Sequence, residues 1–252
     1  MAKVVLFNKP YGVHSQFRKE HDAMPTLADF LADKSLRVAG RLDKDSEGLL
    51  VLTDHGGLNH AITTPPTAIN AKYANAKHAK TYLAQVEHIP SDEQIAMLTA
   101  GVMLKDGQTL PAKVRRIDEQ HLPITLWQRQ PPIRQRMSIP TAWLAISICE
   151  GKNRQVRRML AQVGLPCLRL IRYQVGQWQL GDLAVGESRT LHISDDQLLK
   201  LGVNDTAKPQ TNQQPAKSTK PFAKKSSKYT PKQTKNLRTR PPKFTGKASQ
   251  SS

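Results

Sequence analysis

The sequence has little of what secreted, metal-binding and membrane proteins depend on. It has only two cysteines in 252 residues, Cys149 and Cys167, too few for a disulfide framework or a cysteine-rich metal cluster. No apolar run approaches the ~18 residues of a membrane span, and the first residues lack the apolar core of a signal peptide. We therefore expect a soluble, cytoplasmic protein whose two cysteines are small buried residues.

Acidic residues are also scarce. There are 20 Asp and Glu against 38 Lys and Arg, a formal net charge of +18. Such a balance predicts a polyanionic partner, most often a nucleic acid. Residues 206–252 carry 12 Lys and Arg and no acid, which leaves +6 for residues 1–205. The sequence thus predicts a moderately basic domain followed by a strongly basic tail.

Composition and pattern set the domain organisation and the fold class. From residue 205 the chain is rich in Lys, Pro, Ser, Thr and Gln, so we expect a globular domain over 1–204 and a disordered tail over 205–252. An Ala/Asn/Lys-rich segment, 67–79, predicts a mobile insertion.

Strands are expected at 4–7, 37–39, 49–53, 81–87, 109–118, 143–149 and 168–173. Helices are expected at 25–31, from Ser91, at 153–163 and at 195–201, with a single turn at 59–63. Without regular βαβ alternation, this favours an α+β fold with a mixed, largely antiparallel sheet flanked by helices.

A short acidic loop, residues 39–48, lies between two strand-like runs and has a glycine near each end. Such a loop can hold a carboxylate rigidly at a sheet edge, and Asp43 is the candidate catalytic acid. A second interpretation is that Asp43 and Asp45 only satisfy turn amides.

A third interpretation of the same loop is a calcium site. Its acids follow the first half of a calcium-binding loop, with Asp54 at the twelfth position. The fifth position is Glu47, where Asp or Asn is usual, and the second half is rich in strand formers.

A basic helix is predicted after Glu150-Gly151-Lys152, with Val156, Met159, Leu160 and Val163 as its buried stripe. It carries Arg154, Arg157 and Arg158. The helix N-terminus and these arginines would form a good anion site, although arginines on a solvated surface are the simpler interpretation.

Four motifs together resemble the pseudouridine synthases, in the branch acting on ribosomal RNA that includes the small-subunit synthase A and the large-subunit synthases B, E and F. The motifs are Gly40-Arg41-Leu42-Asp43 with Ser46-Glu47-Gly48-Leu49-Leu50, Lys80-x-Tyr82, residues 150–159, and Leu170-x-Arg172 with Val175-Gly176. The resemblance covers about residues 3–193. An Asn-Lys-Pro opening without a preceding S4 domain, and the loop at 131–140, point within this branch to the group of synthase E.

The resemblance implies the pseudouridine synthase fold and a set of roles. Asp43 would be the essential aspartate, Tyr82 would contact the target base and Arg157 would pair with the aspartate. RNA would be held by Arg41, which fills the gap left by the flipped base, by Leu170 under the base, and by Lys152, Arg154, Arg158, Arg134 and Arg136. The implied partner is bacterial 23S rRNA, free or in an assembling large subunit, and no protein partner is implied. The sequence gives no sign of oligomerisation, so a monomer is the default expectation.

The implied reaction breaks the bond between ribose C1′ and uracil N1 and remakes it to C5. It needs no cofactor and no metal. Asp43 would attack the sugar carbon or remove the C2′ proton, and both routes stay open. The rival function is a noncatalytic rRNA-binding or ribosome-assembly factor on the same fold. A metal-dependent nuclease is weaker, because no second acidic cluster completes a metal site.

Overall fold

The computed structural model describes residues 1–64, 79–134, 136 and 138–203. The chain divides into two units, Met1–Gln210 and Thr211–Ser252, and every described residue belongs to the first. The segment 67–78 and the tail predicted from residue 205 lie outside the described residues. None of the helices formed by the described residues is long and apolar enough to cross a membrane.

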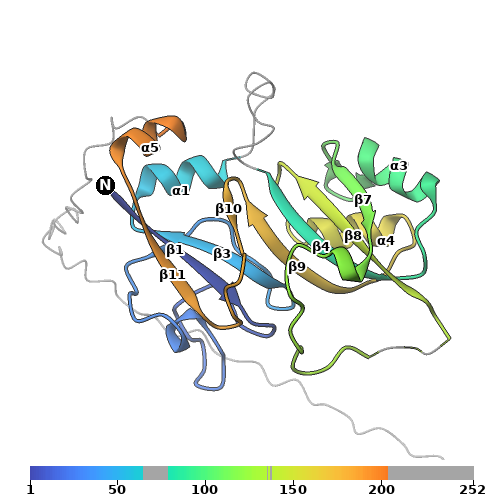
Figure 1. Ribbon diagram of the computed structural model, residues 1–252, viewed down its shortest axis with the longest axis horizontal. Helices are drawn as coiled ribbons and strands as arrows, with labels where there is room; N and C mark the ends of the chain where they lie inside the picture. The colour runs from blue at the N-terminus through green and yellow to red at the C-terminus, as the bar shows by residue number, and fades with distance from the viewer. Residues whose placement is uncertain (65–78, 135, 137, 204–252) are drawn as a thin grey trace, which may run out of the picture. The chain divides into compact units, whose positions relative to one another are not determined.

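One mixed sheet organises the described unit (Figure 1). Its main path runs β11-β1-β3-β9-β4-β8-β7, with β2 beside β3 and β10 beside β9. All these pairs are antiparallel except β3 and β9, which are parallel. The strands are β1 (Ala2–Lys9), β2 (Arg37–Val38), β3 (Glu47–Thr53), β4 (Lys80–Glu87), β7 (Lys113–Ile117), β8 (Thr141–Ile148), β9 (Cys167–Val175), β10 (Trp178–Gln179) and β11 (Ser188–Ile193). A separate hairpin joins β5 (Met103–Leu104) to β6 (Gly107–Gln108).

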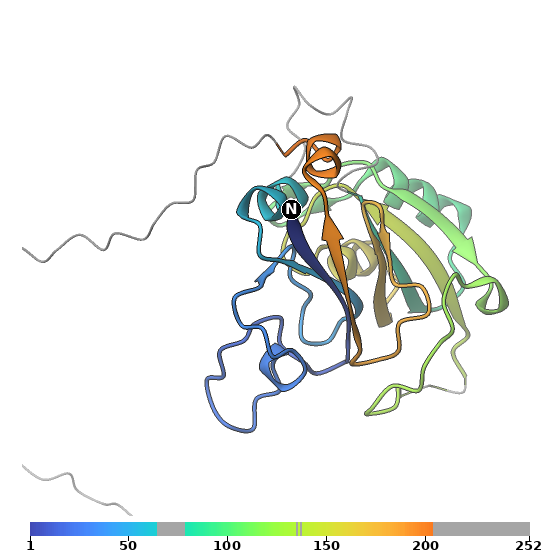
Figure 2. The same ribbon diagram turned by 60° about the vertical axis from the view of Figure 1, so that its left-hand side comes forward.

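Two apolar clusters form because successive strand residues point to opposite faces of the sheet. One contains Tyr82, Ala84 and Leu170, and is joined by residues from helices α3 and α4 and the 3-10 turn η1. The other contains Leu83 and Ile171, and is joined by residues from helices α1 and α5. Both views show α1 and α5 side by side (Figure 2). The helices are α1 (Gly56–Thr63), α3 (Asp92–Ala100), α4 (Gln155–Gln162) and α5 (Asp195–Lys200), with the turns η1 (Leu27–Asp29) and η2 (Glu119–His121).

The register at the centre of the sheet brings the first residues of β3 and β4 beside Arg172 of β9. Gly48 at the start of β3 pairs with Arg172 of β9, and Arg172 pairs with Tyr82 of β4. Gly48 has φ +96, and a Cβ there would collide with the Arg172 carbonyl. Only glycine therefore allows β3 to approach β9 this closely. The acidic loop enters the sheet at this point.

The predicted α+β fold class, with a mixed, largely antiparallel sheet flanked by helices, is confirmed. The helix expected at 25–31 is only the turn η1. The strand expected from residue 109 begins at Lys113, because Pro111 cannot donate a ladder hydrogen bond. The edge strand β11 escaped detection because most of its side chains are exposed. Cys149 and Cys167 are half-buried, not fully buried.

Candidate active site

The backbone on both sides of Asp43 is fixed by the N-terminal segment. Ser15 Oγ donates to the Leu42 carbonyl at 2.7 Å and accepts from the Leu42 amide at 3.1 Å. The Lys44 carbonyl accepts from the Gly12 amide at 2.8 Å. Asp43, 32% exposed at its side chain, is therefore presented by a loop that has little freedom to move.

A buried lysine supports the same loop from beneath. Lys9 is fully buried and donates to the carbonyls of Pro10 and Val13 at 2.9 and 2.8 Å, and more weakly to that of Lys44 at 3.4 Å. Desolvation by burial lowers the pKa of Lys9 to about 7, although the nearby carboxylates of Glu47 and Asp45 partly oppose the shift. Lys9 thus holds the turn that follows β1 against the loop that carries Asp43.

A pocket of about 330 Å³ opens beside Asp43. Its volume is within the range of small-molecule binding pockets and suits one nucleoside. The predicted site residues that line it are Arg41, Asp43, Tyr82, Lys152, Arg154 and Leu170. The structure therefore brings together residues from the acidic loop, β4, the start of α4 and β9.

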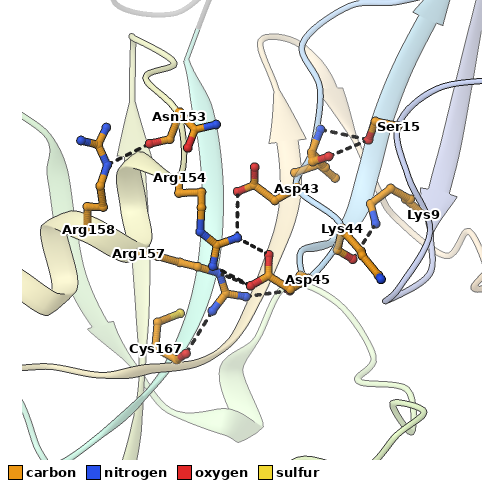
Figure 3. A network of polar contacts seen from close by, with 11 residues as sticks. Lys9, Ser15, Asp43, Lys44, Asp45, Asn153, Arg154, Arg157, Arg158 and Cys167 are labelled. Carbon is orange, nitrogen blue, oxygen red and sulfur yellow. Dashed lines mark hydrogen bonds and ion pairs between the residues drawn. The ribbon is translucent and has the colours of Figure 1, made fainter. Parts of the chain in front are cut away.

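The arginine that reaches Asp43 is Arg154 and not Arg157 (Figure 3). Arg154 forms a bidentate pair with Asp45 at 2.6 and 2.7 Å, and its Nη1 lies 3.9 Å from Asp43 Oδ2. Arg157 donates to the carbonyls of Asp45 and Cys167 at 2.7 and 3.0 Å, and its Nε lies 3.4 Å from Asp45 Oδ2. The expectation that Arg157 pairs with Asp43 is thus corrected. Arg154 is the N-cap of α4 with φ 47 and ψ 34, so its side chain leaves the helical register and turns toward the acidic loop.

Asp45 binds both arginines and so connects the polar network of Asp45, Arg154 and Arg157. The hydrogen bonds from Arg154 hold the pKa of the Asp45 carboxyl below its usual range, and the charge of Arg157 acts in the same direction. Two cations therefore converge on one carboxylate that stands two residues from Asp43. The network joins α4 to the acidic loop and fixes the position of Arg154 beside Asp43.

Of the residues expected to bind RNA, two have side chains bound to other parts of the protein, although Lys152 also lines the pocket, and two lie outside the pocket. Lys152 donates to the Gly107 and Gln108 carbonyls, and Arg158 forms a bidentate pair with Asp106 at 2.6 and 3.0 Å. These two side chains hold the β5–β6 hairpin against α4. Arg134 and Arg136 are exposed and are not pocket residues.

The calcium interpretation of the acidic loop is wrong, because its acids face different partners. Asp45 is bound by Arg154, Glu47 by Arg169, and Asp54 accepts from the Lys3 amide. In the described part of the chain, no three His, Cys, Asp or Glu side chains converge on one point.

Two further cations line the pocket without having been assigned a role. Lys80 begins β4 and Arg172 lies in β9, and both are buried. Each stands in a motif that carried the resemblance, but sequence alone cannot show that the two strands pair side by side.

Comparisons with known proteins agree with this geometry. The sequence model described as RNA pseudouridylate synthase matches residues 3–162. The chain is 49% identical over 191 residues to a protein named ribosomal large subunit pseudouridine synthase E from Vibrio parahaemolyticus, covering 76% of this chain and 74% of that one. It is 50% identical over 188 residues to the protein of that name from Xanthomonas campestris pv. campestris, covering 74% and 94%.

A solved structure agrees as well. A crystal structure titled as that of a pseudouridylate synthase shares 28% identity and superposes with a TM-score of 0.59 over 80% of this chain and 74% of its own. Family match, close relatives and fold point the same way: the chain belongs to the RNA pseudouridylate synthase family and is an RNA-modifying isomerase.

Proposed function

We propose that this protein converts a specific uridine of large-subunit rRNA to pseudouridine, with Asp43 as the catalytic carboxylate. The observation that carries the proposal is the position of Asp43: it stands at a nucleoside-sized pocket, on a loop fixed from both sides, beside Arg154. The substrate class follows from relatives about 50% identical that are named for the large ribosomal subunit. We further propose a monomeric enzyme of the bacterial cytoplasm that requires no protein partner.

The chemistry of the reaction assigns roles to Asp43, Tyr82 and Leu170 at the pocket. The target uridine leaves its stack, at a cost of a few kcal/mol, and enters between Tyr82 and Leu170. Asp43 then attacks C1′ or removes the C2′ proton, and the bond to N1 breaks. After the uracil turns over, C5 bonds to C1′ while the bond between Asp43 and C1′ breaks or Asp43 returns the proton to C2′. Tyr82 then accepts the C5 proton, and N1 takes up a proton from solvent.

The RNA-binding roles are also proposals. Arg41 is exposed at the pocket mouth, where it can fill the gap left by the flipped base. Arg134 and Arg136 lie on the 131–140 segment outside the pocket, and would contact the RNA backbone.

The test of the proposed function is product formation. Purified protein is incubated with large-subunit rRNA carrying tritium at uridine C5, and tritium release is measured with small-subunit rRNA as the control. Release from the large-subunit RNA alone supports the proposal. Tight binding without release from RNA of several sources would favour the assembly-factor alternative.

Replacing Arg154 by Gln is expected to lower kcat roughly tenfold, because one charged contact at a partly exposed site contributes on the order of 1–2 kcal/mol. The control variant is Arg189→Gln. Arg189 lies on β11 and forms an exposed ion pair with Asp182, so its replacement should leave kcat unchanged. Steady-state kinetics on the same RNA measure both. Equal kcat values for the two variants would contradict the role of Arg154.

Deleting residues 206–252 is expected to flatten the salt dependence of RNA binding. The deletion removes 12 basic residues, and the slope of log K against log salt becomes shallower with every phosphate that the protein no longer neutralises. Filter binding between 50 and 300 mM salt measures the slope for both proteins. An unchanged slope would show that the tail does not contact RNA.

A further inference from the structure

Lys80 and Arg172 put two positive charges into the wall of the pocket. They stand on neighbouring strands, and both lie on the sheet face that also carries Tyr82 and Leu170. Lys80 is 7% exposed and Arg172 only 1%. A Cβ built on Gly40 would lie 3.6 Å from Lys80 Cε, so Lys80 lies under the loop that carries Asp43.

Neither cation has a carboxylate partner among the residues that the structure describes. Arg172 donates Nε to the Leu49 carbonyl and Nη2 to the Gly40 carbonyl, at 2.9 and 2.8 Å. Within the described ranges, no carboxylate comes within ion-pair distance of either side chain. The contrast is with Arg169 and Arg154, which bind Glu47 and Asp45. Burying two like charges without a counterion is costly, and such a site is completed by an anion from outside.

The reaction supplies an anion at this depth. When the bond between C1′ and N1 breaks, its electron pair stays on the uracil and is shared among N1, O2 and O4. Asp43 meanwhile either bonds to C1′ or takes the C2′ proton, so the departing base is anionic by both routes. In the proposed function the flipped base is the part of the nucleotide that enters the pocket, and the phosphates stay outside it.

We propose that Lys80 is a catalytic residue, whose ammonium group donates to a carbonyl oxygen of the departing uracil and stabilises its negative charge. This inference rests on the proposed function. Arg172 contributes a fixed background charge, because two of its donors are held by backbone carbonyls. Lys80 has the flexible side chain and is the group that can follow the base as it turns over.

The electrostatics of the site predict how the rate depends on pH. Burial, and after it the charge of Arg172, lower the pKa of Lys80 to about 8, while Cys149 opposes the shift. Tyr82 on the same strand and Asp43 on the overlying loop also face the pocket. Because the charged form is the active one, the contribution of Lys80 is present below pH 8 and is lost as the pH rises through that value.

The test separates chemistry from binding. Single-turnover rates at saturating enzyme, and RNA affinities measured separately, are compared for wild type, Lys80→Met and Lys80→Arg, with Lys34→Met as an exposed control. Lys80→Met should slow turnover by about 100-fold, the usual cost of removing one donor to a developing oxyanion, with RNA affinity unchanged. Lys80→Arg should recover part of the rate and lose the fall above pH 8. Lys34→Met should match wild type in rate, affinity and pH profile.

Other outcomes overturn the proposal in distinguishable ways. A wild-type rate in Lys80→Met with weakened binding would make Lys80 a phosphate contact. A thermal unfolding midpoint far below wild type would make it a structural residue, whereas removing an uncompensated buried charge should leave the midpoint equal or higher. If Lys80→Met fails to fold, a wild-type rate that stays flat from pH 7 to 9.5 still contradicts the role. Wild-type inactivity on every RNA would instead refute the proposed function itself.

Discussion

Asp43→Asn is expected to bind large-subunit rRNA with nearly wild-type affinity and to form no pseudouridine. Asparagine has the shape of aspartate but is neither a good nucleophile nor a base, so both routes open to Asp43 are closed. The backbone of the loop is held by Ser15 and Gly12, and these contacts do not involve the Asp43 side chain. The fold and the pocket should therefore be preserved while the chemistry is lost.

Tritium release from C5-labelled rRNA measures turnover, and a filter-binding titration on the same RNA measures affinity. The matched variant is Asp45→Asn, which removes the carboxylate two residues away that holds Arg154 and Arg157. It should slow turnover by releasing Arg154, without abolishing it. Turnover by Asp43→Asn at the wild-type rate would refute the assignment of the catalytic acid.

The sequence predicted the fold class correctly because alternation of apolar residues along a strand is a local property. The same reasoning located the acidic loop and the buried stripe of α4, where Val156, Met159 and Leu160 are all buried. It missed β11, because this edge strand has mostly exposed side chains and so carries no alternation signal.

The partner of Asp43 could not be predicted from spacing. Helical geometry places Arg154 and Arg158 on one face, but Arg154 is the N-cap and has a left-handed backbone. Its side chain therefore points to Asp43 and Asp45, whereas Arg158 turns to Asp106. Likewise, only the pairing of β4 with β9 reveals that Lys80 and Arg172 line one pocket.

Arg169→Met is expected to be the most destabilising of the substitutions considered, at about 3–5 kcal/mol, because it leaves a buried carboxylate without its cation. Arg169 and Glu47 are 5% and 1% exposed and are joined by two hydrogen bonds of 2.9 and 3.0 Å. Trp127 Nε1 also donates to Glu47 at 2.8 Å. The pair links β9 to the start of β3, the parallel strands on which the acidic loop depends.

Urea unfolding followed by tryptophan fluorescence measures the effect against Arg189→Met, whose pair with Asp182 is exposed and should contribute less than about 1 kcal/mol. The double variant Glu47→Gln, Arg169→Met removes the negative charge of the buried Glu47 side chain but keeps an acceptor for Trp127. It should therefore be more stable than Arg169→Met alone, whereas additive effects of the two substitutions would make it less stable. If the double variant were the less stable of the two, Glu47 would be stabilised by other groups, and the ion pair would not be what holds β3 and β9 together.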